Sequence, residues 1–326
     1  MVAIGVAGLV GLFPPESRAQ QSAANGVIYV RHAPTLGGLV QGSIQQLLPE
    51  DITLVGNAGI SGDLLVPGTP NVTTHGSAAV EAVIEGNGAL IPSNYSVTLT
   101  GNVHLMRIVR RTNPVTLTAV NPPARPVGTR SVSLGGSNQA PGDFSTLRDL
   151  ALDGGANSVS IPPGIYGDFV ANGNAVFRVG IAGATSRARY DFQHLTLNGS
   201  SRIEVVGPVI ITVGAGMSPA GSLGASGHPA WLQLNLAAGD FSLSGSAVFY
   251  GFVNAPGGSV AINGGAHLVG GVSADRFATS GSAWVQSVPK DEPNRLPTVR
   301  LFSPTEGTAH TFPATLTLAA SAEDSD

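Results

Sequence analysis

Residues Phe241 to Phe249 read Phe-Ser-Leu-Ser-Gly-Ser-Ala-Val-Phe, and this order of residue types recurs elsewhere in the chain. Apolar and polar residues alternate up to a glycine, small residues follow, and an apolar residue ends the segment. Alternation with a period of two predicts a half-buried strand, and the shared glycine predicts a tight corner between strands. The other clear copies are Leu195–Ile203, Val260–Leu268 and Phe277–Val285.

The spacing of these copies predicts how the strands stack. Gly245, Gly264 and Gly281 are 19 and then 17 residues apart, which suits one coil of a β-helix and is too short for a propeller blade of about 40 residues. Successive coils would lie about 4.8 Å apart and would align residues of the same kind. The expected interior files are Leu243 with Ile262 and Thr279, and Phe249 with Leu268 and Val285.

Weaker copies of the pattern lie nearer the N-terminus, at Ile52–Ile60 and Val97–Leu105. We therefore expect an all-β protein whose main part, residues 131–288, is a right-handed parallel β-helix, or β-solenoid. Residues 20–130 are expected to form a β-rich region of irregular solenoid rungs.

Several segments resemble one bacterial family, and together the resemblance covers roughly residues 145 to 288. They are Pro162–Phe177, Leu195–Gly199, Val206–Val213 and Val248–Gly264. They look like the Gly-rich β-helical domain of exported and pilus-associated bacterial proteins of unknown function, and their rung pattern is similar to that of polymer-forming bactofilins. The resemblance implies a fold and a place at the cell surface, but no reaction.

The composition excludes several classes of function. Only 11% of the 326 residues are charged, against a usual value of about 25%, and 44 are glycine, which favours β structure over long helices. The net charge of -4 disfavours a nucleic-acid partner. The one local basic cluster, Arg107, Arg110 and Arg111, is interpreted as a solvated strand edge or turn. Without cysteine, the chain has no disulfide and no thiolate metal site.

The N-terminus resembles a signal peptide. Residues Val2 to Phe13 form an apolar run that is too short to span a bilayer but suits the hydrophobic region of such a signal. Small residues at Ser17 and Ala19 match a cleavage site after Ala19. We expect residues 1–19 to be removed, the protein to be extracellular or at the cell surface, and the mature chain to have no membrane span.

The C-terminus departs from the rest of the chain. Residues 289–297 concentrate charge and proline, which is typical of a linker. Residues 298–326 resemble the opening two strands of the Ig-like modules found in tandem on bacterial surface proteins. An Ig-type sandwich needs about 100 residues. We therefore expect this module to be truncated and the sequence to be a piece of a longer protein.

The polar residues do not suggest a catalytic site. Polysaccharide lyases and hydrolases with β-helix folds need clustered or paired carboxylates, whereas the aspartates here are scattered singly. The seven histidines lack the spacing of a metal site. We expect no catalytic residue, no metal and no cofactor. The scattered aspartates of the solenoid region are Asp143, Asp149, Asp153, Asp168, Asp191, Asp240 and Asp275.

Two functions remain after these exclusions. The first is a structural or adhesive surface module, whose partner is a surface protein or a glycan and whose solenoid ends can associate with further copies. The second is carbohydrate binding or processing, with Trp284, Tyr250, Trp231 and His228 as ligand-binding candidates. Trp284 occupies the variable position of its repeat, so we expect its side chain to point outward.

Overall fold

The computed structural model describes residues 26–91, 93–137, 139–156, 158–290, 298–303 and 319–323. The predicted signal peptide and most of the predicted linker lie outside these residues. The chain divides into two units, Met1–Pro289 and Lys290–Asp326. Within the described ranges, no helix has the length and apolar character needed to cross a membrane.

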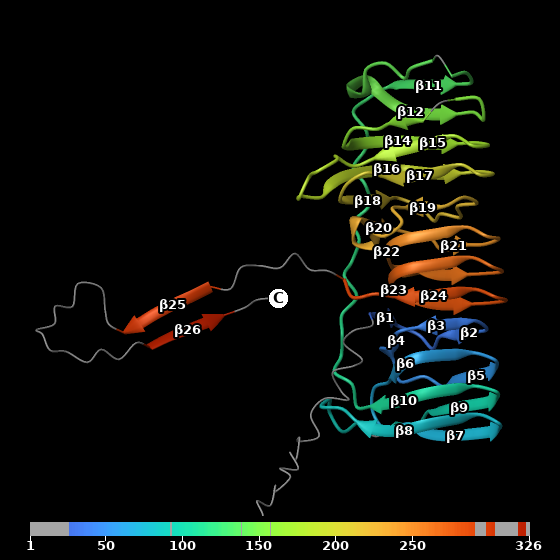
Figure 1. Ribbon diagram of the computed structural model, residues 1–326, viewed down its shortest axis with the longest axis vertical. Coiled ribbons are helices and arrows are strands. Elements are labelled where there is room, and N and C mark those ends of the chain that lie inside the picture. The colour runs from blue at the N-terminus through green and yellow to red at the C-terminus, as the bar shows by residue number, and fades with distance from the viewer. Residues whose placement is uncertain are drawn as a thin grey trace, which may run out of the picture. The chain divides into compact units, whose positions relative to one another are not determined.

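The described part of the first unit is built from β-strands joined by loops (Figure 1). The strands before residue 111 are β1 (Val27–Val30), β2 (Thr35–Leu36), β3 (Leu39–Gln41), β4 (Ser43–Gln46), β5 (Ile52–Gly56), β6 (Gly59–Leu65), β7 (Asn71–Gly76), β8 (Ala79–Glu85), β9 (Ser96–Gly101) and β10 (His104–Arg110). The later strands are β11 (Arg130–Leu134), β12 (Leu147–Leu152), β13 (Val159–Ser160), β14 (Gly164–Ala171), β15 (Val176–Val179), β16 (Ala188–Leu197), β17 (Arg202–Val205), β18 (Val209–Val213), β19 (Leu223–Gly224), β20 (Leu232–Leu236), β21 (Phe241–Leu243), β22 (Val248–Ile262), β23 (His267–Thr279) and β24 (Trp284–Ser287). Two single-turn 3-10 helices are η2 (Phe144–Thr146) and η3 (Pro229–Trp231).

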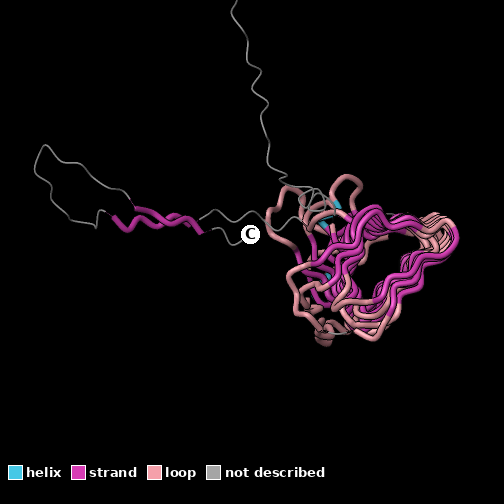
Figure 2. Tube along the Cα trace, turned by 90° about the horizontal axis from the view of Figure 1, so that it is seen from below, coloured by secondary structure: helices cyan, strands magenta, loops and turns pink. Residues whose placement is uncertain are grey.

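These strands pair in parallel, so the expected all-β fold with parallel strands is confirmed. Viewed along the stack, the strands superpose around a closed outline (Figure 2). The expected interior files are present: Leu243 pairs with Ile262, which pairs with Thr279, and Phe249 pairs with Leu268, which pairs with Val285. All six residues are buried.

The repeated glycines form a column at one corner of the stack. Gly245, Gly264 and Gly281 all have φ between 68° and 70°, the left-handed conformation that only glycine adopts readily. A Cβ at Gly281 would lie 3.2 Å from backbone atoms of Gly264. The corner therefore needs glycine for its backbone conformation, and at Gly281 also because the neighbouring strand connection comes close.

The order of strands in the stack differs from their order in the sequence. β10 lies between β6 and β8, although β8 precedes it in the chain. The two ends of the described body also meet: β1 and β2 pair with β23, and β3 pairs with β24. The described chain thus begins in the middle of the stack. Strands β1 to β10 form one part, β11 to β24 form the other, and the last of these strands lies beside the first (Figure 1).

This join gives a pairing pattern that a regular β-helix lacks. The pairings of β1, β4, β6, β3, β24 and β23 close a ring of six strands. The ring forms because β6 and β23 are long enough to pair with different neighbours at their two ends. The strands therefore form a parallel stack, and at the join their connections differ from those of a regular β-helix.

A segment without regular structure, residues 112–129, connects the two parts of the stack. We call it the strap; it runs along the outside from β10 to β11 (Figure 1). Three side-chain amides from different levels of the stack donate to its carbonyl groups. The donors are Gln45 to Asn113, Asn254 to Thr118, and Gln193 to Pro123 and Ala124.

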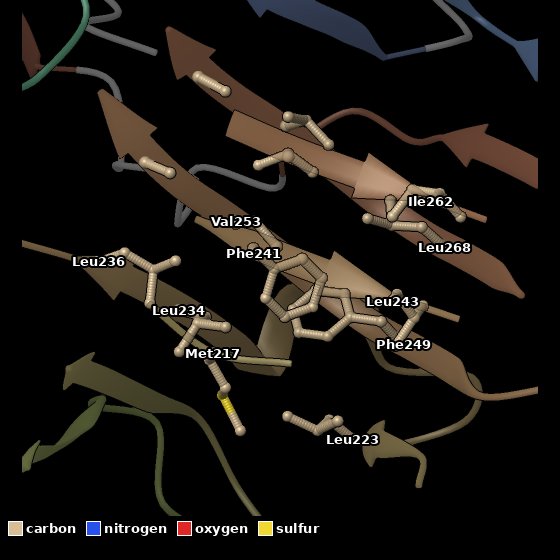
Figure 3. Close-up of a cluster of buried hydrophobic side chains, with 14 of the residues drawn as sticks. Met217, Leu223, Leu234, Leu236, Phe241, Leu243, Phe249, Val253, Ile262 and Leu268 are labelled. Carbon is tan, nitrogen blue, oxygen red and sulfur yellow. The ribbon is translucent and has the colours of Figure 1, made fainter. Parts of the chain in front are cut away.

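Apolar side chains fill the interior of the stack without interruption. One section, built from β18 to β23, packs Phe241 against Phe249 at a ring-centroid distance of 5.3 Å (Figure 3). Further along the stack, the Tyr166 ring is tilted against Phe169 at 4.7 Å and stacks on Phe192 at 5.6 Å. Its burial raises the pKa of Tyr166 to about 12, and its hydroxyl donates to the carbonyl of Pro162.

The prediction of a solvated basic cluster is wrong for Arg107. This residue forms a two-point ion pair with Asp63, and both side chains are largely buried, at 16% and 7% exposed. Register explains the pair, because β10 lies directly against β6. The hydrogen bond that Arg107 donates to Asp63 raises the pKa of Arg107 further. Arg110 forms a more exposed ion pair with Glu85.

The second unit contains two described strands, β25 (Thr298–Ser303) and β26 (Ala319–Glu323), which pair antiparallel. Two antiparallel strands are compatible with the expected start of an Ig-like module, which stays a prediction.

Candidate functional site

Four neighbouring strands present one continuous outward surface. On β22, β23, β24 and β3, every second side chain points away from the interior, and strand pairing aligns these side chains in two files. The first file contains Val248, His267, Trp284 and Leu39, and the second contains Tyr250, Val269, Gln286 and Gln41. We call these eight residues the aromatic face.

Trp284 lies at the centre of the first file. It is partly exposed, and its ring meets the His267 ring edge-on at a centroid distance of 5.4 Å. Its other neighbour, Leu39, is 42% exposed. The Leu39 side chain lies over Gly59 of the next strand, since a Cβ at Gly59 would be only 3.0 Å from it. The prediction that Trp284 points outward beside His267 and Val248 is therefore confirmed.

The second file adds polar groups next to these rings. Tyr250 is half-exposed and is followed by Val269 and by the amides Gln286 and Gln41. An amide both donates and accepts hydrogen bonds, as a phenol does. The aromatic face therefore offers ring surfaces on one side and uncharged hydrogen-bonding groups on the other.

The aromatic face contains no Asp, Glu, Lys or Arg. Charged residues begin two strands farther along both files. The first file continues from Val248 through Ser222 to Arg202, and the second continues from Tyr250 through Gly224 to the ion pair of Glu204 with Arg178. An uncharged, partly apolar surface that contains several aromatic rings is typical of a contact site.

The aromatic face exists only because the two parts of the stack meet. Trp284 belongs to the last strand of the long C-terminal part, whereas Leu39 and Gln41 come from the beginning of the chain. The paired strands β24 and β3 bring these residues together across the join. Sequence reasoning identified Trp284 and Tyr250 but missed Leu39 and Gln41, because no local pattern places β3 beside β24.

The other two predicted ligand-binding residues lie elsewhere. His228 is exposed and stacks on the half-buried ring of Trp231 in η3, with a centroid distance of 4.1 Å and nearly parallel planes. Trp231 also packs against the hydrophobic core. This pair forms a second, smaller aromatic contact and does not join the aromatic face in any interaction that we observe within the described residues.

Register also brings together polar residues that are far apart in the sequence. Ser131, Asp149, Asp168 and His194 lie in one outward file across β11, β12, β14 and β16. The Ser131 hydroxyl donates to Asp149 over 2.7 Å, and His194 Nδ1 lies 2.6 Å from an Asp168 carboxylate oxygen. We call these four residues the polar file. No local sequence pattern predicts it, since the two aspartates are 19 residues apart.

The Asp149 carboxylate is occupied by structural contacts. Partial burial alone would raise its pKa, but hydrogen bonds from Arg148, the Asp168 backbone N–H and Ser131 outweigh that effect and lower the pKa. A Cβ on residue 167 would overlap Asp149 Oδ1, so glycine at this position leaves room for the carboxylate. Asp149 therefore ties β12 to its neighbours β11 and β14.

The polar file does not form an enclosed chemical site. Both side chains of the Asp168–His194 pair are largely exposed, at 59% and 62%. Within the described ranges, no three His, Asp or Glu side chains are placed to hold a metal ion. The arrangement supports a solvated hydrogen-bonding ladder between strands.

Comparison of the chain with protein-family models, with curated proteins and with solved structures finds no match in any of the three.

Proposed function

We propose that this protein is a non-catalytic structural or adhesive module of an exported bacterial cell-surface protein, built as a right-handed β-solenoid. The observation that carries the proposal is the aromatic face, eight outward side chains held in register on paired strands. Such strands offer a rigid support, because ladders of backbone hydrogen bonds fix the position of each side chain along the stack.

The composition of the exterior supports a role in contact. Surfaces that bind a partner without catalysing a reaction often contain partly apolar, aromatic patches surrounded by polar residues. Trp284 and Leu39 supply such a patch, and Gln41 and Gln286 border it. Export is supported by the apolar run at the N-terminus and by the small residues that follow it.

A second candidate function is carbohydrate binding, and the same surface favours it. Aromatic rings provide apolar faces on which sugar rings can stack, while amides and a phenol exchange hydrogen bonds with hydroxyl groups. An uncharged face suits a neutral glycan better than an acidic one. The register of Tyr250, Val269 and Gln286 across three strands would let an extended chain lie along the stack.

The test measures binding of the full chain to a glycan array and to intact cells, and compares Trp284→Ala with Trp231→Ala. Both substitutions remove a tryptophan, but only the first changes the aromatic face. Saturable binding that Trp284→Ala abolishes and Trp231→Ala preserves would support the proposal. Binding that is unchanged in Trp284→Ala and in Tyr250→Ala would exclude the aromatic face as the contact surface.

A sugar-specific signal would favour carbohydrate binding, whereas binding to cells without any glycan signal would favour a protein partner. Circular dichroism of each variant confirms that the β structure is retained.

A further inference from the structure

The end of the stack formed by β7 and β8 has unpaired strand edges. Among the described residues, β7 pairs only with β9, and β8 pairs only with β10. One edge of each strand therefore has backbone N–H and C=O groups without a ladder partner. Free edges of this kind are templates for pairing with another strand.

The interior of the stack is also uncovered at this end. Val83 continues the file of Leu64 and Ile108, both of which are fully buried, but Val83 itself is 40% exposed. Thr74 continues the buried file of Leu54 and Leu99 and is exposed as well. These side chains belong to the interior by register, yet no further strand of the described chain covers them.

Exposed aliphatic side chains gather next to this edge. Of the eleven most exposed large hydrophobic residues in the described part of the chain, four lie between positions 83 and 91. They are Val83, Ile84, Leu90 and Ile91. Because Gly86 and Gly88 hydrogen-bond to Arg110 and Arg111, the segment after β8 is held beside β10 at the same end.

The opposite end of the stack also finishes in a strand with one free edge, since β11 pairs only with β12 among the described residues, but its apolar side chains are better covered. Leu134, in the terminal strand β11, is only 4% exposed. The segment that follows β11 leads into η2, whose Phe144 ring meets Tyr166 edge-on at 6.3 Å. Of the large hydrophobic residues described between 120 and 160, Val127 alone is among the most exposed, at 90%, and it lies in the strap just before β11. The two ends therefore differ in chemistry.

We propose that the β7–β8 end binds the same end of a second copy of this chain, forming a dimer with two-fold symmetry. The two-fold axis would set β8 of one copy antiparallel to β8 of the other and would bury Val83, Ile84, Leu90 and Ile91 of both. This inference does not rest on the proposed adhesive function.

The asymmetry of the stack favours this arrangement over a filament. Head-to-tail stacking would place the four exposed aliphatic residues of the β7–β8 end against the β11 end. Beside β11, Val127 is the one strongly exposed large hydrophobic residue among those described, so most of the four would lack an apolar partner. A two-fold contact pairs apolar with apolar and strand edge with strand edge, and it closes after two copies. Of the two glutamates of β8, Glu85 forms an ion pair with Arg110. Glu81 is exposed in the middle of the strand, so the register of the contact must keep it away from Glu81 of the second copy.

The first experiment measures the mass of the full chain by sedimentation equilibrium over a range of concentrations. We expect a dimer, and we expect Ile84→Lys combined with Leu90→Lys to raise the dissociation constant at least about tenfold. Ile181→Lys is the matched control, since Ile181 is 54% exposed in a different part of the chain, and this variant should remain dimeric. A wild-type monomer at all concentrations, or a dimer unaffected by the double lysine variant, would overturn the proposal.

The second experiment identifies the end involved and uses the absence of cysteine from the chain. Single substitutions Ala79→Cys, Glu81→Cys and Val83→Cys along β8 should give a disulfide-linked dimer, with the highest yield at the position nearest the two-fold axis. Ser133→Cys on β11 should give none. Cross-linking by Ser133→Cys alone would place the contact at the other end. A double variant with Val83→Cys and Ser133→Cys tests for a filament, since cross-linking of this variant alone would mean that unlike ends meet. Either result contradicts the two-fold dimer.

Discussion

Arg31 forms an ion pair with Asp275, 244 residues farther along the chain. The pair lies where β1 meets β23, at the join between the two parts of the stack. His32 lies beside it, with Nδ1 2.8 Å from Glu50 and Nε2 3.7 Å from Asp275. Asp275 thus faces two basic side chains from the beginning of the chain.

Removing Asp275 should weaken the join. We expect Asp275→Ala to lower the free energy of unfolding by about 1 kcal/mol, since the ion pair is only partly exposed but remains screened by water. Urea unfolding followed by circular dichroism measures the effect. The matched control is Glu204→Ala. Glu204 pairs with Arg178 and is more exposed than Asp275, so its loss should lower the free energy of unfolding by less than about 0.5 kcal/mol. Equal losses in both variants would mean that Asp275 has no special role at the join.

The interior files should carry most of the stability. Phe249 is fully buried and contacts Phe241, so Phe249→Ala should lower the free energy of unfolding by about 3–5 kcal/mol. Its neighbour Val248 points outward, and Val248→Ala should cost no more than about 0.5 kcal/mol. Similar losses for the two variants, measured by chemical denaturation, would contradict the register of β22.

Glycines at the corners should differ in their tolerance of alanine. Gly245 has φ of 70°, but a Cβ added there would meet no atom within 4 Å, so Gly245→Ala should cost only the conformational strain of about 1–2 kcal/mol. A Cβ at Gly270 would overlap the carbonyl oxygen of Gly251, and Gly270→Ala should cost about 3 kcal/mol or more. Thermal unfolding of the two variants compares them directly, and a less stable Gly245→Ala would refute this reasoning.

Asp149 should make the free energy of unfolding depend on pH. Its folded-state pKa is lowered, so its contribution is complete above the unfolded value of about 3.9 and is lost as the pH falls through the folded value. We expect the wild type to exceed Asp149→Asn in stability at pH 7 and the difference to shrink below pH of about 4. The measurement is urea unfolding as a function of pH, and a difference that stays constant down to the acid limit would argue against the predicted linkage.

The sequence alone was sufficient for the local architecture of the C-terminal half. Alternation and the glycines at 245, 264 and 281 predicted strands, corners and two interior files, because these features depend on residues within one or two turns of the stack. The outward position of Trp284 followed from the same repeat. Each of these predictions needs only the period of the pattern and the pairing of adjacent copies.

Only the tertiary structure decided which distant strands meet. The insertion of β10 between β6 and β8 and the pairing of β24 with β3 join strands that are far apart in the sequence. Backbone hydrogen bonds are the same for every parallel pair, and the alternation of apolar residues is shared by many strands of this chain, so neither feature selects the partner. The aromatic face, the buried pair of Arg107 with Asp63 and the polar file all depend on such pairings. Periodicity therefore determined the strands, the corners and which side chains point inward. Long-range pairing set the order of the strands in the stack, and with it which side chains meet on the surface.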